Sequence, residues 1–487
     1  MKRLPALACA VFFTTSCSFV GPVAHPDLAL PSQWSETAPG DSAAPPSSPD
    51  WWRSFGSPQL DALIADAFDG SPDLHAQAER VIQAELTLRA TNSSLFPGLS
   101  LSGNSGWSRS VSGGNASTVE ERKSTSLGLS SSYELDLWGR VAASIASDKA
   151  KLTASRHDYD SARLSLAASV ASTYFQYLAG FERLAIAREN LAIAERVFKV
   201  VEARYRNGAA SSLDLSRQKT TVLSQRAQIG PLEVQVRQTR SALDILRGHP
   251  PGADPLSQQS AAPIATLSIP GIGPGLPSEL LLRRPDIASA EAQLAAAAAN
   301  IGVARAELFP RISLSAGGNL ASGFLLSLAD PSSSVSLTGA LAQTIFDAGR
   351  LNALVDSARS RERELLETYR KVILTSLKEV EDALSNTARD ASQEEAQIQI
   401  LAEAERSLHL AELRYREGAD DLLSVLEAQR TRFSVQDQLA QLRLARLTDA
   451  VDLYKALGGG WKAEDDATAT TTVAPSGAQS AARTPSE

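Results

Sequence analysis

The chain has 487 residues, of which 43% are hydrophobic and 21% are charged, and its formal net charge is -8. This is the composition of a globular protein, and the acidic balance argues against the basic face that binds nucleic acid. Two Cys, five His and one Met are too few for a disulfide framework or a Cys/His metal site, so redox and zinc chemistry are not expected.

Residues 1-16 have the pattern of a signal peptide. Lys2 and Arg3 precede an apolar stretch over 4–13, and a small residue stands directly before Cys17. This arrangement resembles the lipobox of bacterial lipoproteins, whose Cys is acylated and becomes the mature N-terminus. Cys17 is therefore the predicted lipidation site, and no cofactor other than this covalent lipid is expected.

Two neighbours of Cys17 bear on this prediction. Thr14 stands where lipoboxes usually have Leu, so cleavage by ordinary signal peptidase without a lipid is the alternative. Ser18, rather than Asp, follows the Cys. By the resemblance to lipoproteins, this favours release to the outer membrane. We expect residues 17-58 to form the acylated N-terminus and an extended segment.

The rest of the sequence has no run of about eighteen apolar residues. Its most apolar helical stretch, 280–308, is interrupted by charged residues from Arg283 to Glu307. No transmembrane helix is predicted.

The strongest internal signal is a duplication. Four short motifs recur in the same order, at offsets of 213, 213, 210 and 210 residues: Pro72-Asp73-Leu74 as Pro285-Asp286-Ile287, Leu95-Phe96-Pro97 as Leu308-Phe309-Pro310, Gly139-Arg140 as Gly349-Arg350, and Arg204-Tyr205-Arg206 as Arg414-Tyr415-Arg416. We therefore predict a first structural repeat over 59-247 and a second over 278-460. A connector rich in Pro and Gly (248-277) joins them, and 461-487 reads as a disordered tail with little to bury.

Each repeat begins with an Ala-rich segment, 72–92 or 285–307, in which Pro takes the tolerated first turn of a helix. Two segments of alternating polarity follow, including 99–108 and 126–135 in the first repeat and 312–316 and 335–341 in the second. Alternation with small polar residues on one side is typical of outer-membrane barrel strands, and a soluble β-hairpin is the alternative.

Long helices come next. Residues 138–207 contain no Pro, and 350–417 contain neither Pro nor Gly. Each predicts a helix of roughly 100 Å, which must be supported by a bundle or a tube. The chain returns through 211–246, with an expected interruption at Gly230-Pro231, and through 422–457. Four strands per chain are too few to close a barrel of at least about eight, so the chain must oligomerise, and three copies would supply twelve.

Several stretches together resemble a known family. They are LLLRRPDIASAEAQL from Leu280, ANIGVARAELFPRISL from Ala299, IFDAGR from Ile345, YELDLWGR from Tyr133 and LRYREGADDLLSVLEAQRT from Leu413. The chain resembles the TolC-type outer-membrane efflux channels over roughly 18–457, and most closely their NodT-like lipoprotein branch.

The resemblance implies a mixed α and β fold: a trimeric twelve-stranded transmembrane β-barrel continuing into a long α-helical periplasmic barrel, built from an internal two-fold repeat. It also implies a homotrimer anchored by lipid in the cell outer membrane. The channel would passively conduct solutes received through a periplasmic adaptor protein from an inner-membrane pump, of the resistance-nodulation-division class in this branch. The resemblance does not identify the exported solute.

The turns between the long helices are the predicted adaptor-docking tips. They resemble the tip motif of the family, and their candidate residues are Arg204, Tyr205, Gly208, Arg414, Tyr415 and Gly418. The alternative is that the two Gly residues merely cap helices.

Just beyond the second tip, Leu423, Glu427 and Arg430 fall at i, i+4 and i+7 and so share one helix face. By resemblance, this segment narrows the tunnel at its periplasmic mouth, with an apolar ring at Leu423 and an acidic ring at Glu427. Three converging carboxylates repel, so Arg430, or Arg217 of the first repeat, would supply the apposed cation. The alternative is a solvated face with an intrahelical Glu427–Arg430 pair that contributes at most about 0.5 kcal/mol.

An enzyme and a periplasmic scaffold are the two alternative classes of function. An enzyme would need a nucleophile with a base or a pair of carboxylates, and no such constellation stands out, nor do the five His have metal-ligand spacing. A periplasmic helical scaffold or adaptor without a pore also uses long helical hairpins. Such a protein would lack four lipid-facing strands.

Overall fold

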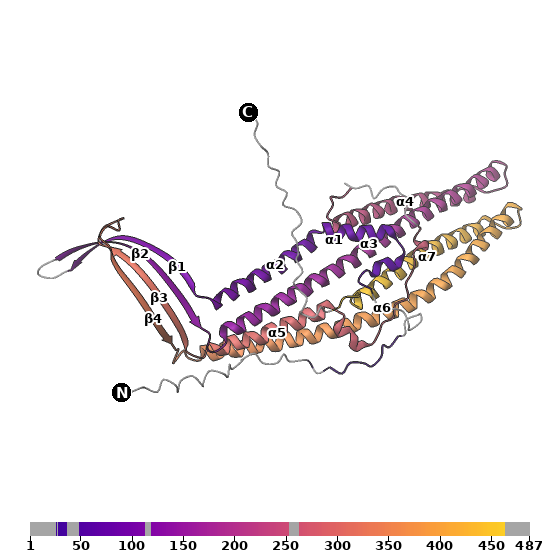
Figure 1. The fold of residues 1–487 in the computed structure, drawn as a ribbon. Coiled ribbons are helices and arrows are strands. Elements are labelled where there is room, and N and C mark those ends of the chain that lie inside the picture. Colours follow the sequence, from indigo (N-terminus) through magenta and orange to yellow (C-terminus); the bar gives the residue numbers. More distant parts are fainter. Residues whose placement is uncertain (1–25, 27, 37–47, 113–117, 253–262, 463–487) are drawn as a thin grey trace, which may run out of the picture.

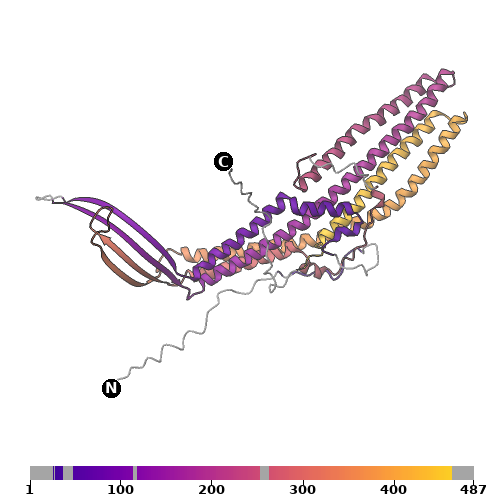
Figure 2. The ribbon, with the colours of Figure 1, turned by 45° about the horizontal axis from the view of Figure 1, so that its top comes forward.

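The computed structural model describes residues 26, 28–36, 48–112, 118–252 and 263–462. The molecule is elongated, with a four-stranded sheet at one end and a bundle of long helices over the rest of its length (Figure 1). Two helical hairpins, α3–α4 and α6–α7, project side by side from the middle and end far from the sheet, as the rotated view also shows (Figure 2).

The two halves of the chain have the same order of elements. A short 3-10 helix, Trp51–Phe55, and α1 (Pro58–Gly70) precede them. The first half contains α2 (Pro72–Asn92), β1 (Gly98–Ser112), β2 (Thr118–Leu135), α3 (Arg140–Arg206) and α4 (Ser212–Leu246). The second contains α5 (Pro285–Ala306), β3 (Arg311–Ser322), β4 (Ser332–Ala342), α6 (Arg350–Arg416) and α7 (Leu422–Ala456). The long helices α3 and α6 both have 67 residues, and the returning helices both have 35.

A Gly and an Asp build the corner from strand to long helix in both halves. Gly139 and Gly349 precede the helices in the left-handed conformation, with φ of 72° and 86°, which costs Gly little. The Asp136 carboxylate accepts from the amides of Val141 and Ala142, and the Asp347 carboxylate accepts from those of Gly349 and Leu351. These bonds satisfy amide groups that the first helical turn leaves without partners.

The strands form one antiparallel sheet in the order β1-β2-β3-β4, so the hairpins of the two halves join through β2 and β3. The register places Leu101 opposite Leu129, and Leu127 opposite Leu320, which gathers the apolar residues on one face. This face is open in the single chain, where Leu99 is 71% and Leu101 69% exposed. The alternation predicted from the sequence is confirmed.

The core lies in the middle of the molecule, where the N-terminal segment crosses the helices. Trp51 stacks on Tyr454 of α7 with ring centroids 5.1 Å apart, and Phe55 packs against Phe175 of α3 at 5.0 Å. Both side chains are buried. The segment 17-58, expected to be extended, therefore contains a helical turn that the aromatic core holds in place.

Two further expectations differ from the structure. Helix α4 runs unbroken through Gly230-Pro231, so the predicted interruption is wrong. A Pro inside a helix removes one backbone hydrogen bond, and α3 supports α4 on both sides of this point through the ion pairs Arg226–Glu195 (2.8 Å) and Arg188–Glu233 (2.9 Å).

Trp461, placed by the sequence analysis in the disordered tail, belongs to the folded part. Its indole N–H donates to Asp160 of α3 at 2.9 Å, and its ring meets His157 edge to face. Within the segments that the structure describes, no helix is both long and apolar enough to cross a membrane.

Candidate functional site

The hairpin tips lie together at the end of the molecule opposite the sheet (Figure 1). The turn after α3 and the turn after α6 are built alike, with Gly208 at φ 71° and Gly418 at φ 75°. In each turn the following residue closes the helix, because the Ala209 amide donates to the Arg204 carbonyl at 2.8 Å and the Ala419 amide donates to the Arg414 carbonyl at 2.9 Å. The two Gly residues therefore do cap helices, which leaves adaptor docking as a prediction.

The returning helices begin with side-chain caps. The Ser211 hydroxyl accepts from the Asp214 amide at 3.1 Å, and hydrogen bonds from Ser211 hold the pKa of the Asp214 carboxyl below its usual value. At the start of α7, the Asp421 carboxylate accepts from the Ser424 amide at 3.1 Å. Such caps contribute about 1 kcal/mol each and fix where the turns end.

One predicted residue from each tip meets the other. The Arg204 guanidinium lies over the Tyr415 ring, 4.5 Å from its centroid, and donates to the Tyr415 carbonyl at 2.5 Å. Tyr415 is buried with Val201, Leu422 and neighbouring apolar residues, and burial raises the pKa of its phenol. The two tips are thus joined by a cation-π contact and a charge-assisted hydrogen bond.

The remaining tip residues stay on the surface. Tyr205 is exposed, and Arg414 pairs with Asp420 of its own turn at 3.4 Å. The positions of Gly208 and Gly418 are open, with no atom within 4 Å of an added Cβ. A larger side chain there would be strained by the backbone and would project outward.

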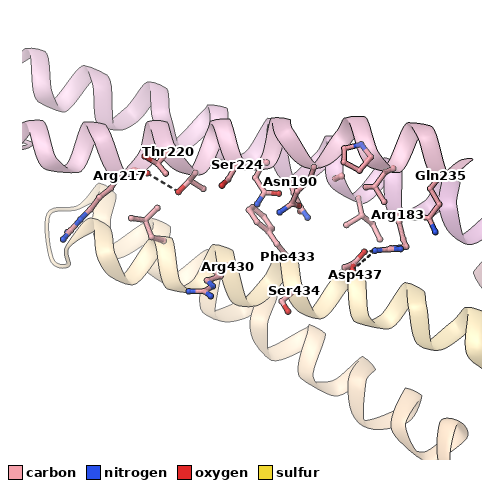
Figure 3. A pocket seen from close by; sticks show the side chains of 18 residues that line it. Arg183, Asn190, Arg217, Thr220, Ser224, Gln235, Arg430, Phe433, Ser434 and Asp437 are labelled. Atoms are coloured by element: carbon pink, nitrogen blue, oxygen red, sulfur yellow. Dashed lines mark hydrogen bonds and ion pairs between the residues drawn. The ribbon is translucent and has the colours of Figure 1, made fainter.

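The predicted gate residues are exposed on the first turns of α7. Leu423 is exposed, and no ion pair joins Glu427 to Arg430 within the described residues. Arg430 of α7 and Arg217 of α4 line one cavity of about 950 Å³ between the hairpins, which neither Leu423 nor Glu427 lines (Figure 3). In this cavity Arg183 of α3 is bound to Asp437 of α7 at 2.6 Å.

A link between the hairpins was missed in the sequence. Arg432 of α7 is buried and donates to Asn190 at 3.2 Å and to Glu189 at 2.8 Å, both on α3. Its spacing from Arg430 puts the two on different sides of α7. No signal in the sequence separates this buried Arg from the exposed ones nearby, because its hydrogen-bond partners Asn190 and Glu189 lie more than 240 residues away.

The family described as outer membrane efflux protein matches residues 63–249 and 276–459. This chain is an outer membrane efflux protein. It is 41% identical to the pyoverdine export outer membrane protein OpmQ of Pseudomonas aeruginosa, over 95% of this chain and 98% of that one. It is 32% identical to the cation efflux system protein CusC of Escherichia coli, over 95% of this chain and 99% of that one.

A solved structure shows the same fold. The open state of the MtrE outer membrane channel of Neisseria gonorrhoeae matches with a TM-score of 0.80 and 27% identity, over 92% of this chain and 99% of that one. The efflux proteins of this family are trimeric channels with a β-barrel and a helical barrel, and this chain has the four strands and long helices of one subunit. The predicted fold class and channel function are confirmed, and the scaffold alternative is wrong.

Proposed function

We propose that this efflux protein docks on a periplasmic adaptor through its two hairpin tips and receives cargo from an inner-membrane pump of the resistance-nodulation-division class. Channels of the family work with adaptors and pumps. The observation that carries the docking role is the Arg204–Tyr415 contact, which holds the two tips as one surface at the end far from the sheet. Tyr205 and Arg414 are exposed on that surface.

Bulky side chains at the tips test docking. The double variant Gly208→Trp/Gly418→Trp should reduce cross-linking to the adaptor, and efflux with it, at least several-fold, because each Trp would project from an open position. The backbone strain of about 1–2 kcal/mol per site should leave the trimer folded. Arg196→Trp, at an exposed position on α3 away from the tip, is the control. Unchanged cross-linking and efflux with an intact trimer would remove the docking role.

We also propose that Leu423, Glu427 and Arg430 line a constriction in the trimer. All three are exposed in the single chain. Arg217 and Arg430 line one cavity that Glu427 does not line, so an acidic ring would meet these cations only across the subunits of the trimer. An acidic constriction favours cation passage.

Glu427→Ala or Arg430→Ala should then raise single-channel conductance in planar bilayers, by roughly a factor of two, and weaken cation selectivity. Each variant removes one half of the contact that would hold the constriction closed. Glu403→Ala, an exposed carboxylate on α6, should change neither quantity. If both gate variants behaved like this control, the residues would be ordinary surface charges.

Lipid attachment at Cys17 is the third proposal, and this residue lies outside the described residues. Mass spectrometry of the mature protein should show an acylated N-terminal peptide that begins at Cys17. Cys17→Ala should lower delivery to the outer membrane more than it lowers conductance, because the sheet has its own apolar face. An unmodified N-terminus at another residue would refute the proposal.

For the cargo we infer small amphiphilic molecules, selected by the pump rather than by the channel. One relative is named for pyoverdine export and another for cation efflux, so channels of similar sequence serve different cargo. Identification of the adaptor and pump that co-purify with the trimer tests this inference. Co-purification with a polypeptide exporter would contradict it.

A further inference from the structure

The line of contact between α6 and α7, the seam, changes within one helical turn from paired opposite charges to two facing acidic side chains. Glu394 of α6 accepts from Arg446 and lies 3.4 Å from Arg443, both on α7, so this turn is held by opposite charges. One turn closer to the sheet, Asp390 of α6 meets Asp449 of α7. Two acidic side chains face each other there, and both are buried, with 3% and 9% of their surface exposed.

These two carboxyl groups have too few partners to be ionised together. The Asp449 carboxyl lies within reach of Asp390, and its buried Oδ2 atom has no hydrogen-bond partner among the described residues. Arg389 donates to the Asp390 carboxylate at 2.6 Å. A hydrogen bond between two carboxyl groups needs a proton on one of them, because ionised carboxylates only accept.

The charges around Asp449 favour its protonated form. On α6, Asp390 opposes its ionisation and Arg389 supports it. On α7, Asp452 opposes it as well. On α3, the acid that pairs with α7 is Glu182, which is bound to Arg443. Burial, followed by the contact with Asp390, raises the pKa of Asp449 to about 7.

We propose that Asp390 and Asp449 form a proton-dependent latch across the α6–α7 hairpin, shut while the pair holds one proton and released when that proton is lost. The unpartnered, buried Asp449 oxygen and the facing Asp390 carboxyl are the binding site, and the ligand is a proton. An ion pair such as Arg446–Glu394 holds the seam over a wide pH range. Two carboxyl groups make the strength of the seam depend on pH.

The direction of the pH dependence follows from the closed and open states of the seam. When it opens, Asp449 meets water and its pKa falls towards the ordinary value, so the closed seam binds the proton more tightly than the open one. Closure is therefore strongest at low pH, weakens as pH rises from about 4 to about 7, and changes little above that. The latch concerns this hairpin alone and does not depend on the proposed gate or docking roles.

The first repeat provides a control inside the same molecule. The positions equivalent to Asp390 and Asp449, at the common helix offset of 210 residues, are Gly180 on α3 and Thr239 on α4. Neither can titrate. The α3–α4 hairpin should thus show how a seam of the same length behaves without the pair.

Hydrogen exchange of the full-length trimer, followed by mass spectrometry at pH 5 and pH 8 and corrected for intrinsic exchange rates, tests the latch. The opening constant of peptides over 385–395 and 444–454 should rise on the order of fiftyfold between these pH values. Asp449→Asn keeps a hydrogen-bond donor towards Asp390 and should abolish the rise. Asp382→Asn, at an exposed α6 carboxylate, should retain it.

Two results would overturn the proposal. One is equal protection of the α6–α7 peptides of the unmodified protein at both pH values, or a rise shared by the α3–α4 peptides. The other is an Asp449→Asn protein with the full pH dependence. The comparison within the unmodified protein decides the question even if the variant fails to assemble.

Discussion

Replacing Arg284 by Met should lower the free energy of unfolding by about 3 kcal/mol. Arg284 is 8% exposed and stands just before α5. It donates to both Asp286 carboxylate oxygens at 2.9 and 2.6 Å, to Glu379 of α6 at 2.7 Å, and to the carbonyl of Ala456 at the end of α7 at 3.0 Å. One side chain thus joins three helices, and its loss leaves these acceptors without their donor.

The neighbouring Arg283 is the matched control. It pairs with Glu279, four residues before it, at 2.8 Å, and both side chains are partly exposed, at 35% and 42%. Arg283→Met should therefore cost less than about 1 kcal/mol. Chemical denaturation of the detergent-solubilised protein measures both losses. Equal losses in the two variants would show that the contacts of Arg284 to α6 and α7 do not determine its contribution.

The predictable part of the fold rests on local patterns. Pro72 and Pro285 mark helix starts, and both helices begin there. The absence of Pro over 138–207 and 350–417 predicted the two 67-residue helices to within two residues at each end. Successive side chains of a strand point to opposite faces of the sheet because of pleat geometry alone. The alternation of polarity in the sequence therefore predicts the two faces of the sheet without knowledge of distant partners.

The parts that sequence reasoning missed depend on distant partners. Nothing beside Trp51 or Phe55 indicates burial, because their partners Tyr454 and Phe175 come from later helices. Pro231 breaks an isolated helix, yet α3 supports α4 on both sides of it. In each case tertiary packing overrides the local preference.

The candidate site shows the same division. Gly208 and Gly418 were recognisable from composition, since turns between long helices favour Gly. The sequence does not predict that Arg204 contacts Tyr415 rather than solvent, because the two residues are 211 positions apart. Likewise, Asp390 and Asp449 each sit in ordinary helical patterns. Only the packing of α6 on α7 makes them a buried pair.

Phe55→Ala should cost about 3–5 kcal/mol of unfolding free energy, the range for removing a fully buried aromatic side chain. Phe55 has no exposed surface, and its ring contacts Phe175 of α3 and Tyr454 of α7, with centroids 5.0 and 6.3 Å away. Its carbonyl accepts from the amide of Ser268 in the connector, a bond that the variant keeps. The loss of unfolding free energy therefore measures the contribution of the Phe55 side chain alone.

The control for Phe55 is Phe181, an aromatic residue on α3 that packs edge to face on Tyr177 at 4.8 Å and is partly exposed. Phe181→Ala should cost less than half as much, because less apolar surface returns to water. The cavity left at Phe55 lies between one long helix of the first repeat and the returning helix of the second. Denaturant titrations measure the loss of unfolding free energy in both variants. If Phe55→Ala lost no more unfolding free energy than Phe181→Ala, the helical turn at Trp51–Phe55 would contact the helices without stabilising the junction of the two repeats.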